Sequence, residues 1–291
     1  MTSLESTPTT RRPAGPARAP FSENAWFWTG SQEMKELESA VCVAARRNIP
    51  VLIVGETGAG KELVAAQLHK ARREHLSCTT VDAPFVPVNV STIPENLAES
   101  ILFGHERGAF TSARERQLGK FEIAKRGILF LDEIQNLDPS LQCKLLRVLQ
   151  SREVDRLGSR QSVAIECQVV AATNLPLEML VAQGRFRKDL YFRLNIFPLY
   201  LPPLRHRKSE FAQIVRAFLR EKIPQHGLTP KPIGAAALRR LEAHDWPGNY
   251  RELEHALVYA HLRGEGEIQE NDLPPSLTGK TESYLKQGIW N

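Results

Sequence analysis

Short apolar runs and helical patterns alternate along the first two thirds of the chain. Apolar runs predict strands at 51–54 and 128–131, and strands are also expected at 85–90 and 167–172. Apolar side chains recur at helical spacing at 31–48, 63–71 and 94–103, and again after Asp138-Pro139, where an N-cap and a proline open a helix. Because strands that alternate with helices are typical of a parallel sheet covered by helices, we expect an α/β fold.

The pattern changes after Pro202-Pro203. Helical patterns follow one another without a further predicted strand, separated by proline and glycine, at 209–222, 234–243 and 249–263. We therefore expect an α/β unit over 26–204 and an all-helical unit over 205–277. The remaining segments, 1–25 and 278–291, are expected to be tails, and the first has the Ser, Thr, Pro, Ala and Arg content typical of disorder.

Composition and charge exclude several classes of protein. Hydrophobic residues make up 42% and charged residues 24% of the chain, which is ordinary for globular proteins and excludes a fibrous or wholly disordered chain. The net charge of +5 is mild, and no basic block in the helical unit predicts a nucleic-acid surface. The chain contains no run of 18 apolar residues, and its four cysteines have neither CxxC nor metal-ligand spacing. We expect a cytoplasmic protein without a membrane partner.

A glycine-rich loop between a predicted strand and a predicted helix carries the strongest chemical signal. Its sequence is GETGAGKE: Gly55, Glu56, Thr57, Gly58, Ala59, Gly60, Lys61 and Glu62. Glycines let backbone N–H groups approach phosphate oxygens, and the helix N-terminus and the lysine add positive charge. This pattern predicts a nucleotide phosphate site. It usually ends in Ser or Thr, whose hydroxyl ligates Mg²⁺; with Glu62 there, the metal must rely on other ligands or on water.

Two carboxylates follow the apolar run at 128–131. A buried strand that ends in Asp132-Glu133 is well placed to face a phosphate loop. We expect Asp132 to hold Mg²⁺, directly or through water, and Glu133 to polarise the attacking water. The alternative interpretation is that the pair only caps the segment that follows.

Three further polar residues are candidates for contacts with the γ-phosphate. Asn174 follows a predicted strand, where its amide could orient water; alternatively it only forms a turn before Leu-Pro. Arg187 and Arg193 are six residues apart, which on a helix places them on nearly opposite sides. A guanidinium offered from a neighbouring subunit would stabilise the transition-state charge, and surface salt bridges are the alternative.

Eight sequence strings identify a family resemblance. They are GETGAGKE, LAESILFGHERGAFTSA, ILFLDEI, LLRVLQ, AATN, GRFRKDLYFRLN, LPPLR and WPGNYREL. Over about residues 29–277 the chain resembles the AAA+ ATPase module of bacterial sigma-54-dependent transcriptional activators, the NtrC-class enhancer-binding proteins. The resemblance implies a P-loop AAA+ parallel sheet flanked by helices, the nucleotide-binding subdomain, followed by a small all-helical lid.

The resemblance assigns roles around the nucleotide. Residues 55–62 match Walker A, and Asp132 and Glu133 match Walker B. Asn89 matches the residue thought to restrain the Walker B glutamate and to link nucleotide state to the target-binding loop. The implied cofactors are ATP and Mg²⁺.

It also implies contacts from further along the chain and from other subunits. Thr173 and Asn174 match sensor I, and Arg251 matches sensor II on the helical lid. Arg187 and Arg193 match arginines that act in trans, which implies active sites between the subunits of a ring, usually a hexamer.

One loop matches the family's target-binding element. It comprises Gly108, Ala109, Phe110, Thr111, Ser112 and Ala113, where the family has GAFTGA and contacts sigma-54. An apolar Phe110 at a loop tip is costly in water and useful against a partner. Ser112 replaces the second glycine, and if that position needs positive φ the cost is about 1 kcal/mol.

The implied function is that of an ATP-hydrolysing ring that remodels the closed complex of sigma-54 RNA polymerase holoenzyme. Typical members also carry an N-terminal regulatory domain and a C-terminal helix-turn-helix. We expect neither here, and hence no intrinsic DNA-binding domain. The alternative hypothesis is a regulatory subunit that joins a homologous DNA-binding activator in a mixed ring. A third is a remodeller of an unrelated protein.

Overall fold

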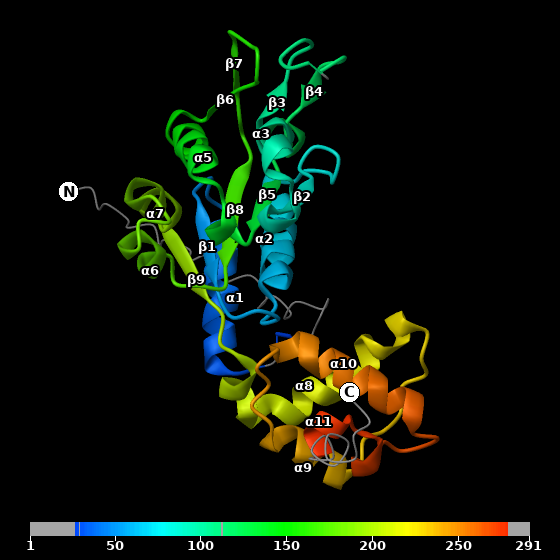
Figure 1. Ribbon diagram of the computed structural model, residues 1–291. Helices are drawn as coiled ribbons and strands as arrows, with labels where there is room; N and C mark the ends of the chain where they lie inside the picture. The colour runs from blue at the N-terminus through cyan, green and yellow to red at the C-terminus, as the bar shows by residue number, and fades with distance from the viewer. Residues whose placement is uncertain (1–26, 29, 112, 279–291) are drawn as a thin grey trace, which may run out of the picture.

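The computed structural model describes residues 27–28, 30–111 and 113–278. Ser112 and the predicted tails, apart from Thr278, lie outside the described residues. The N-terminal part is an α/β unit and the C-terminal part is helical (Figure 1).

A five-stranded parallel sheet forms the centre of the α/β unit, in the order β2-β5-β8-β1-β9. The strands are β1 (Val51–Val54), β2 (Phe85–Asn89), β5 (Ile128–Asp132), β8 (Gln168–Thr173) and β9 (Phe197–Tyr200). The first four are the predicted strands. The fifth, β9, was not predicted: it is only four residues long, contains Pro198 and is followed closely by Pro202-Pro203. The proline is tolerated because β9 is an edge strand that pairs only with β1.

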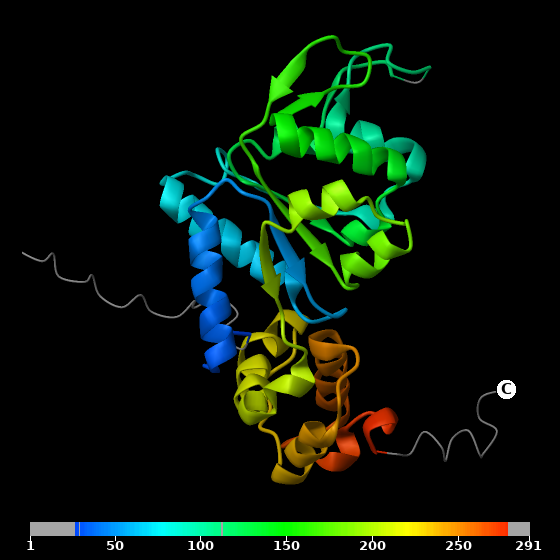
Figure 2. The same cartoon turned by 90° about the vertical axis from the view of Figure 1, so that its left-hand side faces the viewer.

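Alternate residues of the strands enter two apolar clusters, one on each face of the sheet. Ile53, Phe130 and Ala172 pack with the helices α1 (Gln32–Ala45) and α2 (Lys61–Leu76). Leu52 and Leu131 pack on the other face, which is covered by α3 (Glu95–Phe103), α4 (Lys120–Ile123), α5 (Pro139–Ser151), α6 (Leu177–Ala182) and α7 (Lys188–Leu194). Figure 2 shows α1 and α5 on opposite sides of the sheet. This is the predicted parallel sheet flanked by helices.

Helix α2 continues beyond the predicted end at residue 71. The prediction ended at residue 71 because the charged run Arg72-Arg73-Glu74-His75 interrupts the apolar pattern. Arg72 is nevertheless buried, because its guanidinium donates to the carbonyls of Arg126 (3.0 Å) and Arg47 (3.3 Å). Tertiary hydrogen bonds therefore decide where this helix ends.

Two small antiparallel hairpin sheets were not predicted. One pairs β3 (Gly104–His105) with β4 (Gln117–Leu118), and the other pairs β6 (Glu153–Asp155) with β7 (Ser162–Ala164). They lie at the end of the molecule opposite the helical part (Figure 1). Strands of two or three residues carry too little periodicity to be read from a sequence.

The helical part forms a small bundle below the sheet (Figures 1 and 2). It contains α8 (Phe211–Glu221), α9 (Ala235–Ala243), α10 (Asn249–Arg263) and α11 (Pro275–Thr278), with 3-10 turns at Leu204–Glu210, Ile223–His226 and Glu270–Asp272. Phe211, Trp246 and Leu257 share one apolar cluster with α1 and α2. The predicted fold class, an AAA+ sheet with a small helical lid, is confirmed.

Candidate functional site

The phosphate loop connects β1 to α2 in a conformation that depends on glycine. Gly58 and Gly60 have φ of +74° and +97°, in the left-handed region that other residues rarely adopt. Lys61 begins α2, and its Nζ donates to the carbonyls of Gly55 (2.8 Å) and Glu56 (3.0 Å). Burial lowers the pKa of Lys61. A cation at a helix N-terminus beside glycine backbone is a site for phosphate oxygens.

Asp132 brings a carboxylate to the same place. It is the last residue of β5, and burial raises its pKa. It lines a cavity of 220 Å³ with residues of the loop, of α2 and of the lid: Gly58, Gly60, Lys61, Glu62, Leu63, Lys222, Tyr250, Arg251 and Glu254. The structure thus brings the predicted Walker A lysine, Asp132, Glu62 and the predicted sensor II arginine together.

Glu133 follows in a strained conformation. Its φ is +55°, and its N–H donates to Asp132 Oδ1 (3.0 Å). Left-handed backbone at a residue with a side chain costs about 1 kcal/mol and is found at functional sites. The Glu133 carboxylate accepts from Asn136 Nδ2 (3.3 Å).

Asn89 lies next to Asp132 in the sheet register, but within the described residues its side chain makes no hydrogen bond to Asp132 or Glu133. Its Oδ1 accepts from the N–H (3.0 Å) and the hydroxyl (2.6 Å) of Ser91, because Asn89 caps the 3-10 turn Val90–Thr92. The expected restraint of Glu133 by Asn89 stays a prediction.

Asn174 follows β8 and reaches the phosphate loop. Its Nδ2 donates to Thr57 Oγ1 (3.0 Å), and its Oδ1 accepts from Gln135 Nε2 (2.8 Å). Thr173 is buried, and its hydroxyl donates to the Leu175 carbonyl (2.7 Å). Gln135 was not predicted, because a lone glutamine after an acidic pair carries no sequence signal.

The lid holds the phosphate loop through Glu56. This carboxylate pairs with Arg205 (2.5 and 2.8 Å) and accepts from Asn249 Nδ2 (3.1 Å), which together lower its pKa to about 2. Tyr250 N–H donates to the Gly58 carbonyl (3.1 Å). Neither Arg205 nor Asn249 was singled out from the sequence, although they lie in the strings LPPLR and WPGNYREL.

The two candidate trans arginines lie elsewhere. Arg187 is not inside a helix, as we assumed, but at the N-cap of α7 with extended backbone. Its guanidinium pairs with Asp189 (2.7 and 3.0 Å) and contacts Cys143 Sγ (3.1 Å). Arg193 donates to the Leu149 carbonyl (2.8 and 3.1 Å). Neither is among the described residues that line the cavity beside Lys61.

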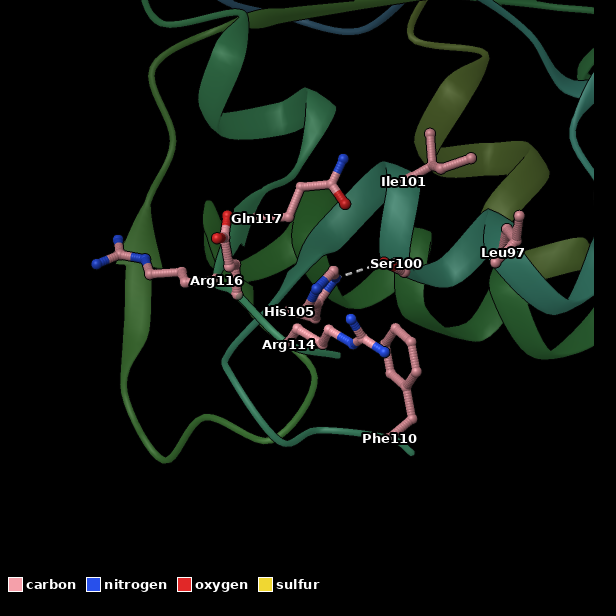
Figure 3. Close-up of a pocket in the computed structure, with 9 residues that line it drawn as sticks. Leu97, Ser100, Ile101, His105, Phe110, Arg114, Arg116 and Gln117 are labelled. Atoms are coloured by element: carbon pink, nitrogen blue, oxygen red, sulfur yellow. Dashed lines mark hydrogen bonds between the residues drawn. The ribbon is translucent and has the colours of Figure 1, made fainter. Parts of the chain in front are cut away.

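The candidate target-binding loop forms a compact turn at the far end of the molecule. Gly108 has φ of +80°, and its N–H donates to the Ala113 carbonyl (2.8 Å), whereas Ser112 lies outside the described residues. Phe110 is 36% exposed, and its ring meets the His105 ring edge-on at 4.9 Å (Figure 3). Both line a cavity of 680 Å³ beside α3. Phe110 is therefore only partly exposed to water, since its ring packs against the ring of His105.

Arg156 anchors this loop to its neighbours. Its guanidinium pairs with Glu106 (2.8 Å), just before the loop, and with Glu122 of α4 (2.5 Å). The Glu106 N–H donates to the Leu157 carbonyl (3.0 Å), so the loop and the β6–β7 hairpin are joined.

The carboxylates of the candidate site are suited to Mg²⁺ that is bound together with a nucleotide. The described residues contain no cluster of three or more His, Cys, Asp or Glu side chains that could enclose a metal ion. Mg²⁺ commonly takes one or two carboxylates together with nucleotide phosphates and waters. Asp132, in the cavity beside Lys61, meets that requirement. Among the helices of the described residues, none has the length and apolar character needed to cross a bilayer.

The chain is similar to known protein families and to characterised relatives. Residues 27–200 match the family described as the sigma-54 interaction domain, and residues 205–288 match the AAA+ ATPase lid domain. DctD of Pseudomonas aeruginosa, a C4-dicarboxylate transport transcriptional regulatory protein, is 46% identical over 265 residues, covering 89% of this chain and 56% of DctD. The DNA-binding transcriptional regulator NtrC of a Bradyrhizobium species is 47% identical over 256 residues, covering 85% and 52%.

Solved structures of NtrX from Brucella abortus have a similar fold. The complex with ATP has a TM-score of 0.75 at 32% identity and covers 87% of this chain and 55% of that one. The complex with ADP has a TM-score of 0.73 at 34% identity, covering 84% and 54%. The chain spans about half the length of these relatives.

Proposed function

Because the chain belongs to the sigma-54 interaction family of AAA+ proteins, we propose that it hydrolyses ATP to drive transcription initiation by sigma-54 RNA polymerase. One observation carries the proposal. Lys61, Asp132 and Arg251, from the phosphate loop, the sheet and the lid, line one cavity. That is the set needed to bind a nucleotide and to couple its state to a second domain.

Each group has a distinct part in this reaction. The backbone of 55–60 and Lys61 would bind the phosphates, and Asp132 would hold Mg²⁺, which would neutralise charge on the phosphate oxygens. Glu133 accepts a proton from the attacking water, and the Asn174 amide orients the γ-phosphate or that water. Arg251 reaches the phosphates from the lid.

A neighbouring subunit completes the site in this proposal. Arg187 and Arg193 do not line the cavity of their own chain, whereas the transition state of phosphoryl transfer gains from an added guanidinium. We therefore propose a ring, usually of six subunits in this family, with active sites at the subunit interfaces.

The loop at 108–113 is the proposed contact with sigma-54. Phe110 keeps a third of its surface exposed beside an open cavity, which suits a protein partner. Hydrolysis at one end of the sheet would move this loop at the other end. Such a protein would act where RNA polymerase acts, in the bacterial cytoplasm.

The experiment is ATP turnover by the purified protein, with Asp132→Ala and Glu133→Gln as variants. Each variant is expected to lose at least about 100-fold in kcat, because metal binding or proton transfer is removed. Glu33→Gln, an exposed change on α1, serves as the control. Undiminished turnover in both variants would contradict the assigned centre.

Open-complex formation on a sigma-54 promoter tests the second half of the proposal. We expect it to require ATP and Phe110. An active ATPase that opens promoters only when mixed with a homologous activator would favour the mixed-ring alternative. ATPase activity without any effect on sigma-54 polymerase would favour a different target.

A further inference from the structure

Gln135 connects three parts of the candidate site: the acidic pair Asp132-Glu133, Asn174 and the phosphate loop. It lies in the 3-10 turn Ile134–Asn136, which begins directly after Glu133. The side chain turns away from solvent and is 9% exposed. Its Nε2 donates to Asn174 Oδ1 (2.8 Å), and Asn174 Nδ2 donates to Thr57 Oγ1 (3.0 Å). Two consecutive hydrogen bonds thus connect the 3-10 turn after Glu133 to Asn174, and Asn174 to the phosphate loop.

This chain of hydrogen bonds has a direction. The oxygen and nitrogen of an asparagine amide have nearly the same shape, so only hydrogen bonds decide which way the group faces. In the structure Gln135 donates through Nε2, so the oxygen of Asn174 faces Gln135. Its NH₂ group then faces the phosphate loop. Because Thr57 Oγ1 accepts from that NH₂, the Thr57 hydroxyl proton remains available for a further acceptor.

The opposite orientation of Asn174 would be unfavourable beside a nucleotide. A carbonyl oxygen facing the phosphate loop would repel phosphate oxygens, whereas an NH₂ group attracts them. The position of Gln135 is itself costly: its Oε1 is buried, with no hydrogen-bond donor among the described residues. A buried acceptor without a partner is destabilising and calls for a functional reason.

We propose that Gln135 is a positioning residue that fixes the amide of Asn174 with its NH₂ toward the γ-phosphate. The inference rests on the proposed ATPase function. Gln135 touches no reacting atom; it acts through Asn174. The strained turn that presents Glu133 is also the turn that places Gln135, so the water-activating carboxylate and the phosphate-facing amide are held by one element.

The test compares Gln135→Met, Asn174→Ala and the double variant. Methionine keeps the length of glutamine and removes the donor. We expect Gln135→Met to lower kcat about three- to tenfold, the size of one hydrogen bond, with KM changed less than about twofold. The double variant should be no slower than Asn174→Ala alone, because Gln135 acts through the amide that is missing. Gln135→Glu, which places an acceptor against Asn174, should be at least as slow as Gln135→Met.

Controls separate positioning from folding. Gln150→Met changes an exposed glutamine on α5 and should leave kcat unchanged. Urea unfolding of each variant shows whether stability has changed. If Gln135 had only a structural role, Gln135→Met would lower the free energy of unfolding, and its loss in kcat would multiply with the loss caused by Asn174→Ala. A kcat for Gln135→Met within twofold of the unchanged protein, or losses that multiply in the double variant, would overturn the inference.

Binding gives a readout that does not require turnover. A non-hydrolysable ATP analogue and ADP differ at the γ-phosphate, so Gln135→Met should reduce the preference for the analogue over ADP about three- to tenfold. If the unchanged protein binds both nucleotides but does not hydrolyse ATP, the proposed function fails while this arm still decides the role of Gln135. An unchanged preference would reject the role.

Discussion

At the residue scale, the candidate site depends on backbone conformations and burial that individual side chains permit. Gly58 has positive φ, and a Cβ built there would lie 2.3 Å from the carbonyl oxygen of Gly248 in the lid. Glycine is needed here both for its φ and for the close approach of two backbones. The same residue therefore shapes the phosphate loop and seats the lid.

Gly58→Ala should consequently impair nucleotide binding. We expect the free energy of unfolding to fall by about 1–3 kcal/mol, from strained φ and the contact with Gly248, and ATP affinity to fall more than about tenfold. Chemical unfolding and nucleotide titration measure the two effects. Gly30→Ala is the matched control, since a Cβ there meets nothing within 4 Å. Equal behaviour of the two variants would contradict this reading of Gly58.

Two buried histidines predict how stability depends on pH. Burial lowers the pKa of His69 and of His261. His261 Nδ1 lies 2.8 Å from the Leu257 carbonyl and its Nε2 accepts from the Lys231 N–H (3.2 Å), as a neutral ring allows. Unfolded histidine titrates near pH 6.5, so below that pH the unfolded chain binds more protons than the folded one.

The free energy of unfolding should therefore decrease as pH falls from about 7 to 5. Urea unfolding across that range measures the slope. Replacing both His69 and His261 with Gln should flatten it, whereas His75→Gln, at an exposed position, should not. An unchanged slope in the double variant would contradict the prediction. Glu56 contributes over a lower pH range. Because its pKa is lowered to about 2, its contribution to the free energy of unfolding is lost as pH falls below about 4.5.

At the element scale, ion pairs join segments of the chain in addition to the apolar clusters. Glu56 links the phosphate loop to the lid, and Arg156 links the loop at 108–113 to α4 and the β6–β7 hairpin. The side chains of Arg156 and Glu122 are each 9% exposed, so this pair is well shielded from water. Short strands bury little apolar surface, and their placement depends on such pairs.

Arg156→Ala should loosen this end of the molecule. It leaves Glu122 without its partner, and hydrogen bonds to charged groups are worth about 1.5–3 kcal/mol each. We expect a loss of stability of that order and weaker promoter opening, with ATP turnover largely retained because the cavity beside Lys61 is distant. Arg147→Ala removes a more exposed pair with Asp155 (3.0 Å) and should have little effect on either. Similar losses in both variants would argue against a special role for Arg156.

At the scale of the whole molecule, the candidate nucleotide site and the candidate target-binding loop lie at opposite ends of the sheet. The lid packs beside the phosphate loop, and the hairpins lie at the far end (Figure 1). The connection begins at Asn89, the sheet neighbour of Asp132, and runs through the turn at Val90–Thr92 and α3 to Gly104. We propose that a change at Asp132 reaches Phe110 through this continuous segment.

Mixing two inactive variants tests whether the site is shared between subunits. Asp132→Ala lacks the metal carboxylate but keeps Arg187, and Arg187→Ala has the opposite defect. In randomly mixed rings at most about a quarter of the interfaces combine an intact cavity with an intact arginine, so activity should return to about that fraction of the unchanged protein. No recovery in rings shown to be mixed would contradict a trans role for Arg187.

The local sequence pattern by itself determined much of the architecture. Four of the five sheet strands could be predicted, and the pattern is plainest for the central strands β1, β5 and β8, because strands buried on both faces have few polar residues. Glycine spacing in the phosphate loop and the carboxylates after 128–131 predict chemistry from residue type alone. The change to helical patterns after Pro202-Pro203 predicts the lid.

Only the tertiary structure decided which distant side chains meet. The edge strand β9 and the buried end of α2 depend on partners far along the chain, which no local pattern encodes, and the strands of the two hairpins are too short to show a pattern. Gln135, Asn249 and Arg156 carry no signal of their own, since an amide or a guanidinium gains a role only from the group it faces. The physical reason is that burial and periodicity are local properties, whereas a hydrogen bond's direction and a carboxylate's pKa depend on neighbours brought together by folding.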